Sequence, residues 1–337
     1  QERPGADPVP AVPDGWVPDV RKLRRFAAEG ADAQGRRFPP ELPRELCESF
    51  GPDGEGEDYD LELLQEAQIV AQPPGRGGPS LMCIVYTTEA SHYAQVRAVR
   101  ETWAGGCDGW LAFSTRSDPR IPAISVPHAG REEYDNVWQK VRSIWRFVAE
   151  HYLEDFGFFV IGGDDIFVLP QNLRDYLAAL GADPGEQHFL GRRFFSRLLF
   201  NSGGAGYVLS RQTLRSLHAH LDDRRCWPRR RTFAEDVMVA ECLAQVAGVA
   251  PVDTRDALLR ERFHPLSPSQ HLYWRPPRDG GHDWYQDYNK DWGLKLGKNC
   301  CAPDSVSFHY IRKPARARHL YALLYTCGLF SPPVDWV

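Results

Sequence analysis

The sequence lacks a long apolar run. Nowhere do its 337 residues approach the roughly 20 consecutive apolar residues of a membrane-spanning helix, so we expect this chain to be soluble. It begins at Gln1, without an initiator Met and without a cleavable signal pattern. We therefore expect an N-terminal segment, which would direct the protein to its compartment, to precede residue 1.

A second absence is a charge excess of either sign. The formal net charge is −5 and both signs are mixed along the chain, so no global field favours nucleic acid or an anionic membrane as a partner. Internal repeats are absent as well. A chain of 337 residues can bury a substantial core, which fits one large domain or one domain with an appendage.

Paired C-x-x-C spacing is also absent, although there are eight cysteines, at positions 47, 83, 107, 226, 242, 300, 301 and 327. This argues against a structural zinc site and favours disulfides formed in a secretory compartment. The alternative is eight buried thiols in a cytosolic enzyme. The neighbours Cys300 and Cys301 either bond to each other, which closes a strained ring, or each pairs elsewhere.

Composition divides the chain into three parts. Residues 1–20 carry prolines at 4, 8, 10 and 13 among Gly, Ala and Asp, which predicts a disordered linker or the remnant of a stalk. Residues 21–79 hold short helical signals, at 20–28 and 60–67, and are expected to wrap around the main domain. The Pro- and Gly-rich stretch 72–79 marks a boundary, and the main domain follows over 80–337.

Strand and helix signals alternate from residue 80 onward. Strands are predicted over 81–87, 110–114, 123–126 and 188–191, and helices over 93–103, 135–152, 171–180, 210–221 and 234–247. In the clearest helix, 135–152, one apolar face is formed by Val137, Val141, Ile144, Val148 and Tyr152. The alternation predicts an α/β domain with a largely parallel central sheet, whose ligand crevice lies at the carboxyl ends of the strands.

The clearest chemical signal lies in residues 158–169. An apolar run is followed by Gly162, Gly163, Asp164 and Asp165 and then by a second apolar run, which predicts a buried strand that ends, exposes two acids and resumes. Carboxylates suit Mg²⁺ or Mn²⁺, which bridge to nucleotide phosphates, and the glycines let a ligand approach the backbone. An ordinary β-turn with two solvated aspartates is the alternative.

Seven stretches between residues 80 and 311 together resemble the inverting β1,3-glycosyltransferases of glycosyltransferase family 31, which include the core 1 galactosyltransferase branch and the Fringe enzymes. In order they are Arg97-Ala98-Val99-Arg100-Glu101-Thr102-Trp103, Asn136-Val137-Trp138-Gln139-Lys140, Gly163-Asp164-Asp165, Asn201-Ser202-Gly203-Gly204-Ala205-Gly206-Tyr207, Glu235-Asp236-Val237, Phe263-His264-Pro265, and Cys300-Cys301 followed by Ser307-Phe308-His309-Tyr310. The likeness is greatest to the core 1 branch.

This resemblance implies a Rossmann-like GT-A fold, a UDP-sugar donor, Mn²⁺ or else Mg²⁺, and work in the Golgi lumen behind an N-terminal membrane anchor that this chain does not include. The implied reaction transfers galactose from UDP-galactose to a glycoprotein or glycan acceptor. A Fringe-like transfer of another UDP-sugar and a non-catalytic, lectin-like or chaperone-like relative are the alternatives. Gly163 stands where the family's metal motif has its first aspartate, which leaves the donor sugar open. The oligomeric state, a homodimer included, is open as well.

The resemblance also assigns residues. Asp165 and His309 would bind the metal, and Asp236 would be the base, with Glu235 as orienter or substitute. We expect the dipole at a helix N-terminus to keep both of these acids ionised. The donor would contact Thr87, Arg97, Arg100, His128, Gly130, Arg131, Lys140, Asp164, Gly204 and Tyr310, and the acceptor Trp284, Tyr285 and Tyr288. Helix-capping acids, a core histidine and solvated basic residues are the ordinary alternatives.

By the family pattern, disulfides would join Cys83 to Cys107, Cys226 to Cys242 and Cys300 to Cys301, which leaves Cys47 for Cys327. The arginines at 224, 225, 229, 230 and 231 surround Cys226 and Trp227. They could bind an acidic acceptor or form a solvated loop, and the sequence alone favours the solvated loop.

Overall fold

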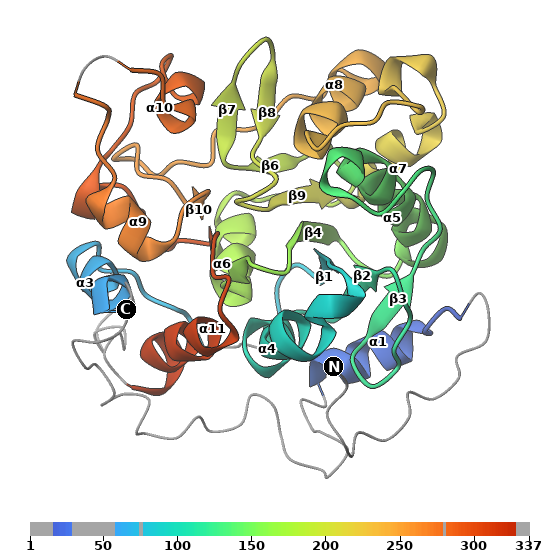
Figure 1. Ribbon diagram of the computed structural model, residues 1–337, viewed down its shortest axis with the longest axis horizontal. Coiled ribbons are helices and arrows are strands. Elements are labelled where there is room, and N and C mark those ends of the chain that lie inside the picture. The colour runs from blue at the N-terminus through green and yellow to red at the C-terminus, as the bar shows by residue number, and fades with distance from the viewer. Residues whose placement is uncertain (1–15, 29–57, 74–76, 279–280, 328–337) are drawn as a thin grey trace.

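The computed structural model describes residues 16–28, 58–73, 77–278 and 281–327, so most of the expected linker lies outside the described residues. A six-stranded sheet forms the centre of the molecule (Figure 1). In spatial order its strands are β3 (Ala123–Ser125), β2 (Gly109–Ser114), β1 (Leu81–Tyr86), β4 (Phe158–Gly163), β9 (Tyr207–Ser210) and β6 (Phe189–Gly191). All six run parallel except β9, which is antiparallel to both neighbours. The prediction of an α/β domain with a largely parallel central sheet is confirmed.

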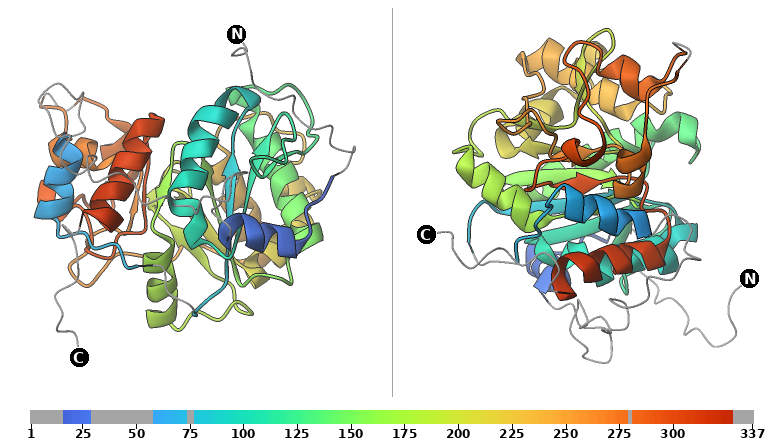
Figure 2. Two further views of the ribbon diagram at one scale, coloured as in Figure 1. Left: turned by 90° about the horizontal axis from the view of Figure 1, so that it is seen from below. Right: turned by 90° about the vertical axis from the view of Figure 1, so that its left-hand side faces the viewer.

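Helices cover both faces of this sheet (Figure 2). On one side of the sheet lie α4 (Arg97–Glu101) and α6 (Pro170–Ala179), with α3 (Asp58–Glu66) and α11 (Pro314–Tyr321) farther out (Figure 1). The other side carries α1 (Val20–Ala28), α5 (Val137–Tyr152), α7 (Arg211–His220) and α8 (Glu235–Ala247). Successive side chains of β1 alternate between the two cores: Leu81 and Cys83 enter one, Met82 and Ile84 the other. A strand buried on both sides is apolar throughout, which explains the continuous apolar run at 81–86.

A second, three-stranded sheet was not predicted. It consists of β10 (Phe263–His264), β11 (Ser307–Phe308) and β5 (Phe167–Val168), with β11 parallel to β10 and antiparallel to β5. The chain passes from β4 of the central sheet through Asp164 and Asp165 into β5 of this small sheet. Because β11 pairs with β5, the end of β11 lies beside Asp165, and the Ile311 N–H donates to the Asp165 carbonyl oxygen at 2.8 Å.

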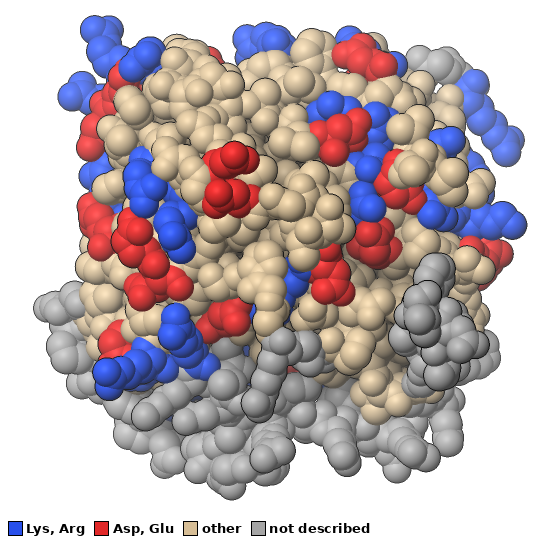
Figure 3. Space-filling model, turned by 180° about the vertical axis from the view of Figure 1, so that it is seen from behind, with Lys and Arg blue, Asp and Glu red and all other residues tan. Residues whose placement is uncertain are grey.

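The remaining elements are short. A hairpin of β7 (Arg193–Phe195) and β8 (Leu199–Asn201) follows β6, and the helices α9 (Pro268–Tyr273) and α10 (Trp284–Tyr288) precede the last part of the chain. Acidic and basic side chains are interspersed over the face seen in Figure 3, as the mixed composition predicts.

Disulfides join Cys83 to Cys107, Cys226 to Cys242 and Cys300 to Cys301, so these three expected pairs are confirmed. The fourth expected pair includes Cys47, which lies outside the described residues.

Two helices of the expected N-terminal wrap are present, α1 and α3, and both contribute to the cores through Leu23 and Leu64 respectively. The division of the chain at residues 20 and 79 stays a prediction. Within the described ranges, no helix combines the length and the apolar character needed to cross a membrane.

Candidate functional site

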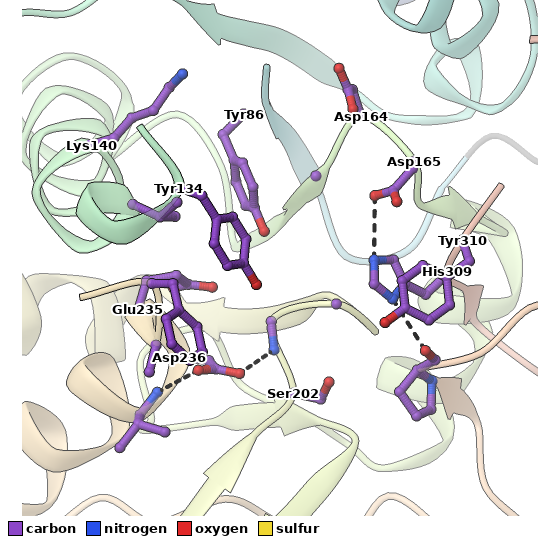
Figure 4. A pocket seen from close by; sticks show the side chains of 18 of the residues that line it. Tyr86, Tyr134, Lys140, Asp164, Asp165, Ser202, Glu235, Asp236, His309 and Tyr310 are labelled. Carbon is purple, nitrogen blue, oxygen red and sulfur yellow. Dashed lines mark hydrogen bonds and ion pairs between the residues drawn. The ribbon is translucent and has the colours of Figure 1, made fainter. Parts of the chain in front are cut away.

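A cleft of about 880 Å³ opens where the parallel strands β1 and β4 end (Figure 4). Its walls come from the residues after these two strands, the loop between β8 and β9, the first turn of α8 and the segment after β11. This is the carboxyl edge of the parallel strands, where open α/β sheets bind their ligands.

At one end of the cleft, the Asp165 carboxylate faces the His309 imidazole (Figure 4). The Asp165 Oδ1 lies 3.3 Å from His309 Nε2, and His309 Nδ1 lies 3.1 Å from the Pro265 carbonyl oxygen. A carbonyl only accepts hydrogen bonds, so Nδ1 carries a hydrogen and Nε2 is the ring atom that faces the carboxylate. At this separation Nε2 can donate a hydrogen to the carboxylate, or the two atoms can bind one cation together.

This pair fits a divalent cation. Ligand atoms held about 2.1 Å from one ion at right angles lie about 3 Å apart, close to the 3.3 Å observed here. A mixed oxygen and nitrogen set suits Mn²⁺ better than Mg²⁺, which prefers oxygen alone. Burial would raise the pKa of Asp165, but His309 and Arg312 outweigh it and hold this pKa below its usual value.

A second cluster of ligand-type residues does not fit a metal. Ligand atoms of His264, His271 and Cys301 lie within 4.8 Å of one another. However, the Cys301 sulfur is bonded to Cys300, so no thiolate is present. Both imidazoles are buried, and burial lowers the pKa of His264 and brings the pKa of His271 to about 3. These rings are therefore neutral parts of the core.

Asp164 turns away from the Asp165 pair. Thr87 Oγ1 donates to Asp164 Oδ2 at 2.6 Å, because β1 and β4 end at the same level of the sheet. The buried Lys140 Nζ donates to the Thr87 carbonyl oxygen and to Glu132. These contacts join the ends of β1 and β4 to α5, and they place one ammonium group in the cleft wall.

The acid pair at the start of α8 lies at the other end of the cleft. Glu235 is 3% exposed, and its Oε2 accepts a 2.9 Å hydrogen bond from the Tyr207 hydroxyl. Asp236 is half-buried and accepts hydrogen bonds of 2.8 Å from the N–H groups of Gly203 and Val237. Burial raises the pKa of both carboxyls, which opposes the effect expected from the helix dipole, so that both acids are ionised stays a prediction.

The two acids nevertheless differ. The N–H donors of Gly203 and Val237 oppose the effect of burial on the pKa of Asp236. Glu235 accepts from the Tyr207 hydroxyl instead, and the neighbouring Asp236 charge adds to burial in raising its pKa. These contacts favour the charged form of Asp236 over that of Glu235.

The glycines between β8 and β9 lie between the two ends of the site. A Cβ added at Gly203 would lie 2.4 Å from Glu235 Oε1, and one added at Gly204 would lie 2.6 Å from ring atoms of His309. Real Cβ atoms do not approach other atoms this closely. Glycine is therefore needed at both positions because this loop packs directly against the acid pair and the imidazole.

The structure brings eleven of the predicted site residues to the cleft: Thr87, Lys140, Asp164, Asp165, Gly204, Glu235, Asp236, Trp284, Tyr288, His309 and Tyr310. The other six, Arg97, Arg100, His128, Gly130, Arg131 and Tyr285, do not line it.

The reasons for these six placements are visible in their contacts. Arg97 pairs with Glu101 at 2.6 Å, and Arg100 donates to the Arg120 carbonyl oxygen at 2.6 Å. His128 binds Glu132 at 2.8 Å, and Glu132 in turn contacts Lys140, so His128 reaches the cleft only through Glu132. Gly130 and Arg131 lie in the same turn, where the Asn136 amide bonds the Arg131 carbonyl oxygen. Tyr285 is buried behind the wall.

Sequence reasoning missed Tyr134, Phe233 and Arg312, which all line the cleft. Tyr134 and Phe233 stack with ring centres 5.4 Å apart at its mouth, and they are 74% and 55% exposed. The Arg312 guanidinium lies over the Tyr310 ring at 4.5 Å and 3.6 Å from Asp165. The position of Arg312, three residues after His309, was a usable signal, whereas the stacked rings come from separate segments that no pattern connects.

The sequence of this chain is similar to those of several known proteins. Over 234 residues, 68% of this chain, it is 31% identical to the glycoprotein-N-acetylgalactosamine 3-beta-galactosyltransferase 1 of Xenopus laevis. The chain therefore resembles named glycosyltransferases, among them a β1,3-galactosyltransferase. The N-acetyllactosaminide beta-1,3-N-acetylglucosaminyltransferase 4 and the chondroitin sulfate synthase 3 of Homo sapiens are each 23% identical, over 55% and 58% of the chain. No family model matches the chain.

These comparisons confirm the resemblance to named glycosyltransferases. The aligned parts make up 62% of the Xenopus β1,3-galactosyltransferase and 57% and 23% of the two human proteins, so the chain corresponds to only part of each relative.

Proposed function

We propose that this chain is a metal-dependent, inverting β1,3-glycosyltransferase with a GT-A fold. The single observation that carries the proposal is the arrangement of the cleft, with a metal-type pair, Asp165 and His309, at one end and a half-buried acid, Asp236, at the other. Galactose from UDP-galactose and a sugar on a glycoprotein are the proposed substrates, in keeping with the name of the Xenopus relative.

In such a transfer, the Asp236 carboxylate accepts the proton of the acceptor hydroxyl while that oxygen attacks the anomeric carbon of the donor sugar. The bond from the anomeric carbon to the diphosphate breaks, and the nucleotide leaves with the bond's electron pair from the opposite face, so the configuration inverts. Arg312 and Lys140 supply fixed positive charge in the cleft wall. A bound Mn²⁺, held by Asp165 and His309, would add charge that stabilises the departing diphosphate.

Glu235 acts as a neutral neighbour in this scheme. A second ionised carboxylate beside Asp236 would raise the pKa of the base further, whereas a protonated Glu235 leaves one negative charge at this end of the cleft. The hydrogen bond from Tyr207, whose oxygen also accepts from Trp145 Nε1 at 3.1 Å, holds Glu235 in place.

The test compares three variants in transfer and in UDP binding. We expect Asp236→Asn to lower kcat by about 10²- to 10⁴-fold, the usual contribution of a general base, while calorimetry still detects Mn²⁺-dependent UDP binding. Glu235→Gln, which imitates the protonated acid, is the matched control and should stay within about threefold of the original kcat. Asp165→Asn should lose Mn²⁺-dependent UDP binding. Full turnover by Asp236→Asn would overturn the assignment of Asp236 as the base. UDP binding by the unmodified chain that does not depend on Mn²⁺ would overturn the proposed metal site.

We also propose a location in the Golgi lumen, which the three disulfides support.

A further inference from the structure

The segment between α7 and α8 contains five arginines within eight residues, 224–231. Two of them have carboxylate partners: Arg225 pairs with Asp223 at 2.6 Å, and Arg231 pairs with Glu133 at 2.7 Å. In the described part of the chain, no carboxylate pairs with Arg224, Arg229 or Arg230. We call residues 224–231 the arginine loop, and its net charge is positive. Figure 3 shows basic side chains projecting at the corner that α7 and α8 occupy.

Side chains of α5 hold the backbone of the arginine loop in place. The buried Trp138 Nε1 donates to the Trp227 carbonyl oxygen at 3.0 Å, and the buried Gln139 Nε2 donates to the carbonyl oxygens of Pro228 and Arg230 at 3.1 and 2.7 Å. A disulfide ties Cys226 to Cys242 in α8. A solvated loop needs none of these anchors, so the loop is built as a fixed surface.

Trp227, in the middle of the arginine loop, has an unusual backbone conformation. Its φ is +50°, a left-handed conformation that costs about 1 kcal/mol or more for a residue with a side chain, and such strain concentrates at binding sites. The indole is nevertheless 42% exposed, and the Arg230 guanidinium lies over it at 5.7 Å. A flat apolar ring beside planar cations is suited to binding a polypeptide that carries both apolar groups and carboxylates.

The arginine loop leads directly into the base end of the cleft. Phe233 and Ala234 line the cleft and precede Asp236, and Glu133, the partner of Arg231, lines it as well. The metal pair lies at the opposite end. The end of the loop at Arg231 is therefore next to the base end of the cleft, where the proposed function places the acceptor hydroxyl.

We propose that the arginine loop binds carboxylate side chains of the acceptor polypeptide, close to the residue that carries the acceptor sugar. This inference rests on the proposed function: when the acceptor hydroxyl is at Asp236, the polypeptide attached to that sugar leaves the cleft at this rim. Arginine binds carboxylates through two parallel hydrogen bonds, and unpaired guanidinium groups on a fixed loop bind them without first being reordered. The enzyme would thus select glycosylation sites with acidic neighbours.

The test uses two synthetic glycopeptides with the same single N-acetylgalactosamine-bearing threonine, flanked by glutamates in one and by glutamines in the other. We expect the wild-type chain to favour the acidic peptide about tenfold in kcat/KM and in binding measured by fluorescence anisotropy with UDP and Mn²⁺, and less at high salt. In the double variant Arg224→Gln/Arg229→Gln this preference should disappear, with the neutral peptide and UDP binding unchanged.

The matched control is Arg116→Gln/Arg215→Gln, which removes the same charge from exposed arginines outside the cleft, paired with Glu89 and Glu154. It should keep the preference. Equal binding of both peptides by the wild-type chain, or a preference that survives in Arg224→Gln/Arg229→Gln, would overturn the inference. Stronger competition by a uronic-acid oligosaccharide than by the acidic peptide would also overturn it and assign the loop to a glycan. Preferential binding without any transfer would count against the proposed function instead.

Discussion

Two adjacent acids, Glu235 and Asp236, have different hydrogen-bond partners and different exposure. Asp236 faces two backbone N–H donors, which favour its charged form, whereas Glu235 receives one hydroxyl hydrogen bond inside the core. The sequence placed both acids in the first turn of a helix, where a dipole argument treats them alike. The difference depends on Gly203 and Tyr207, which belong to another element, and so a local pattern could not predict it.

The raised pKa of Glu235 predicts how stability depends on pH. Because the folded chain holds this proton more tightly than the unfolded chain, whose carboxyl has the ordinary pKa of 4.5, the stabilising contribution is complete below pH 4.5 and is lost as the pH rises toward the folded value. Glu235→Gln removes this titration. We therefore expect its free energy of unfolding, relative to wild type, to increase as the pH rises above 4.5, as measured by urea titration.

Exposed carboxylates elsewhere titrate in both proteins and cancel in this comparison. Glu241→Gln, in the same helix but forming a 3.2 Å hydrogen bond with Gln245 at the surface, is the control for replacing a carboxyl in α8. A difference for Glu235→Gln that is flat between pH 4.5 and 8 would mean that Glu235 is ionised in the folded protein.

At the scale of elements, the loop between β8 and β9 couples the two ends of the site. Gly203 packs against Glu235, and Gly204 packs against the His309 ring. Neither glycine has a left-handed φ, so alanine suits the backbone and only its Cβ meets a neighbour. The loop therefore positions the imidazole through contact alone.

Gly204→Ala tests this positioning. The added Cβ, 2.6 Å from His309 ring atoms, must displace the imidazole, so we expect Mn²⁺-dependent UDP affinity to fall about 10- to 100-fold, the usual effect of disturbing a ligand's support. Calorimetry of UDP at fixed Mn²⁺ measures the loss. Gly281→Ala is the control, because its Cβ would meet Pro277 at an ordinary 3.6 Å. Unchanged UDP affinity in Gly204→Ala would show that this contact does not position His309.

Elements with a long local pattern were predictable from the sequence, and elements made by distant pairing were not. The apolar face of α5 extends over several turns, and Ser210 caps α7 through its hydrogen bond to the Thr213 N–H, as expected. In contrast, β5, β10 and β11 have two residues each and exist only because they pair with one another. Asp165 and His309 were assigned together from the family motif, but the pairing of strands β5 and β11, which brings them together, was not predicted.

At the scale of the whole molecule, the N-terminal helix α3 is fastened to the part of the chain that follows the metal-type pair. The carboxylate of Asp60, which is 2% exposed, accepts hydrogen bonds from Arg316 Nε and Nη2 at 2.6 and 2.7 Å and from the Ser269 N–H at 2.8 Å. Arg316 lies in α11, a few residues after Arg312. One buried carboxylate thus joins α3, α9 and α11.

Asp60→Asn tests whether α3 is an integral part of the fold. The amide has one acceptor oxygen in place of two, and it leaves the half-buried Arg316 without a countercharge. We therefore expect the free energy of unfolding, measured by urea titration, to fall by about 2–4 kcal/mol. Glu62→Gln, in the same helix but bonded at the surface to Tyr273, should change stability by less than about 0.5 kcal/mol. Because the change acts on α11, Mn²⁺-dependent UDP binding should weaken as well. An Asp60→Asn protein as stable as the Glu62→Gln control would mean that α3 contributes little to holding α11, and that the N-terminal wrap is separable from the rest of the chain.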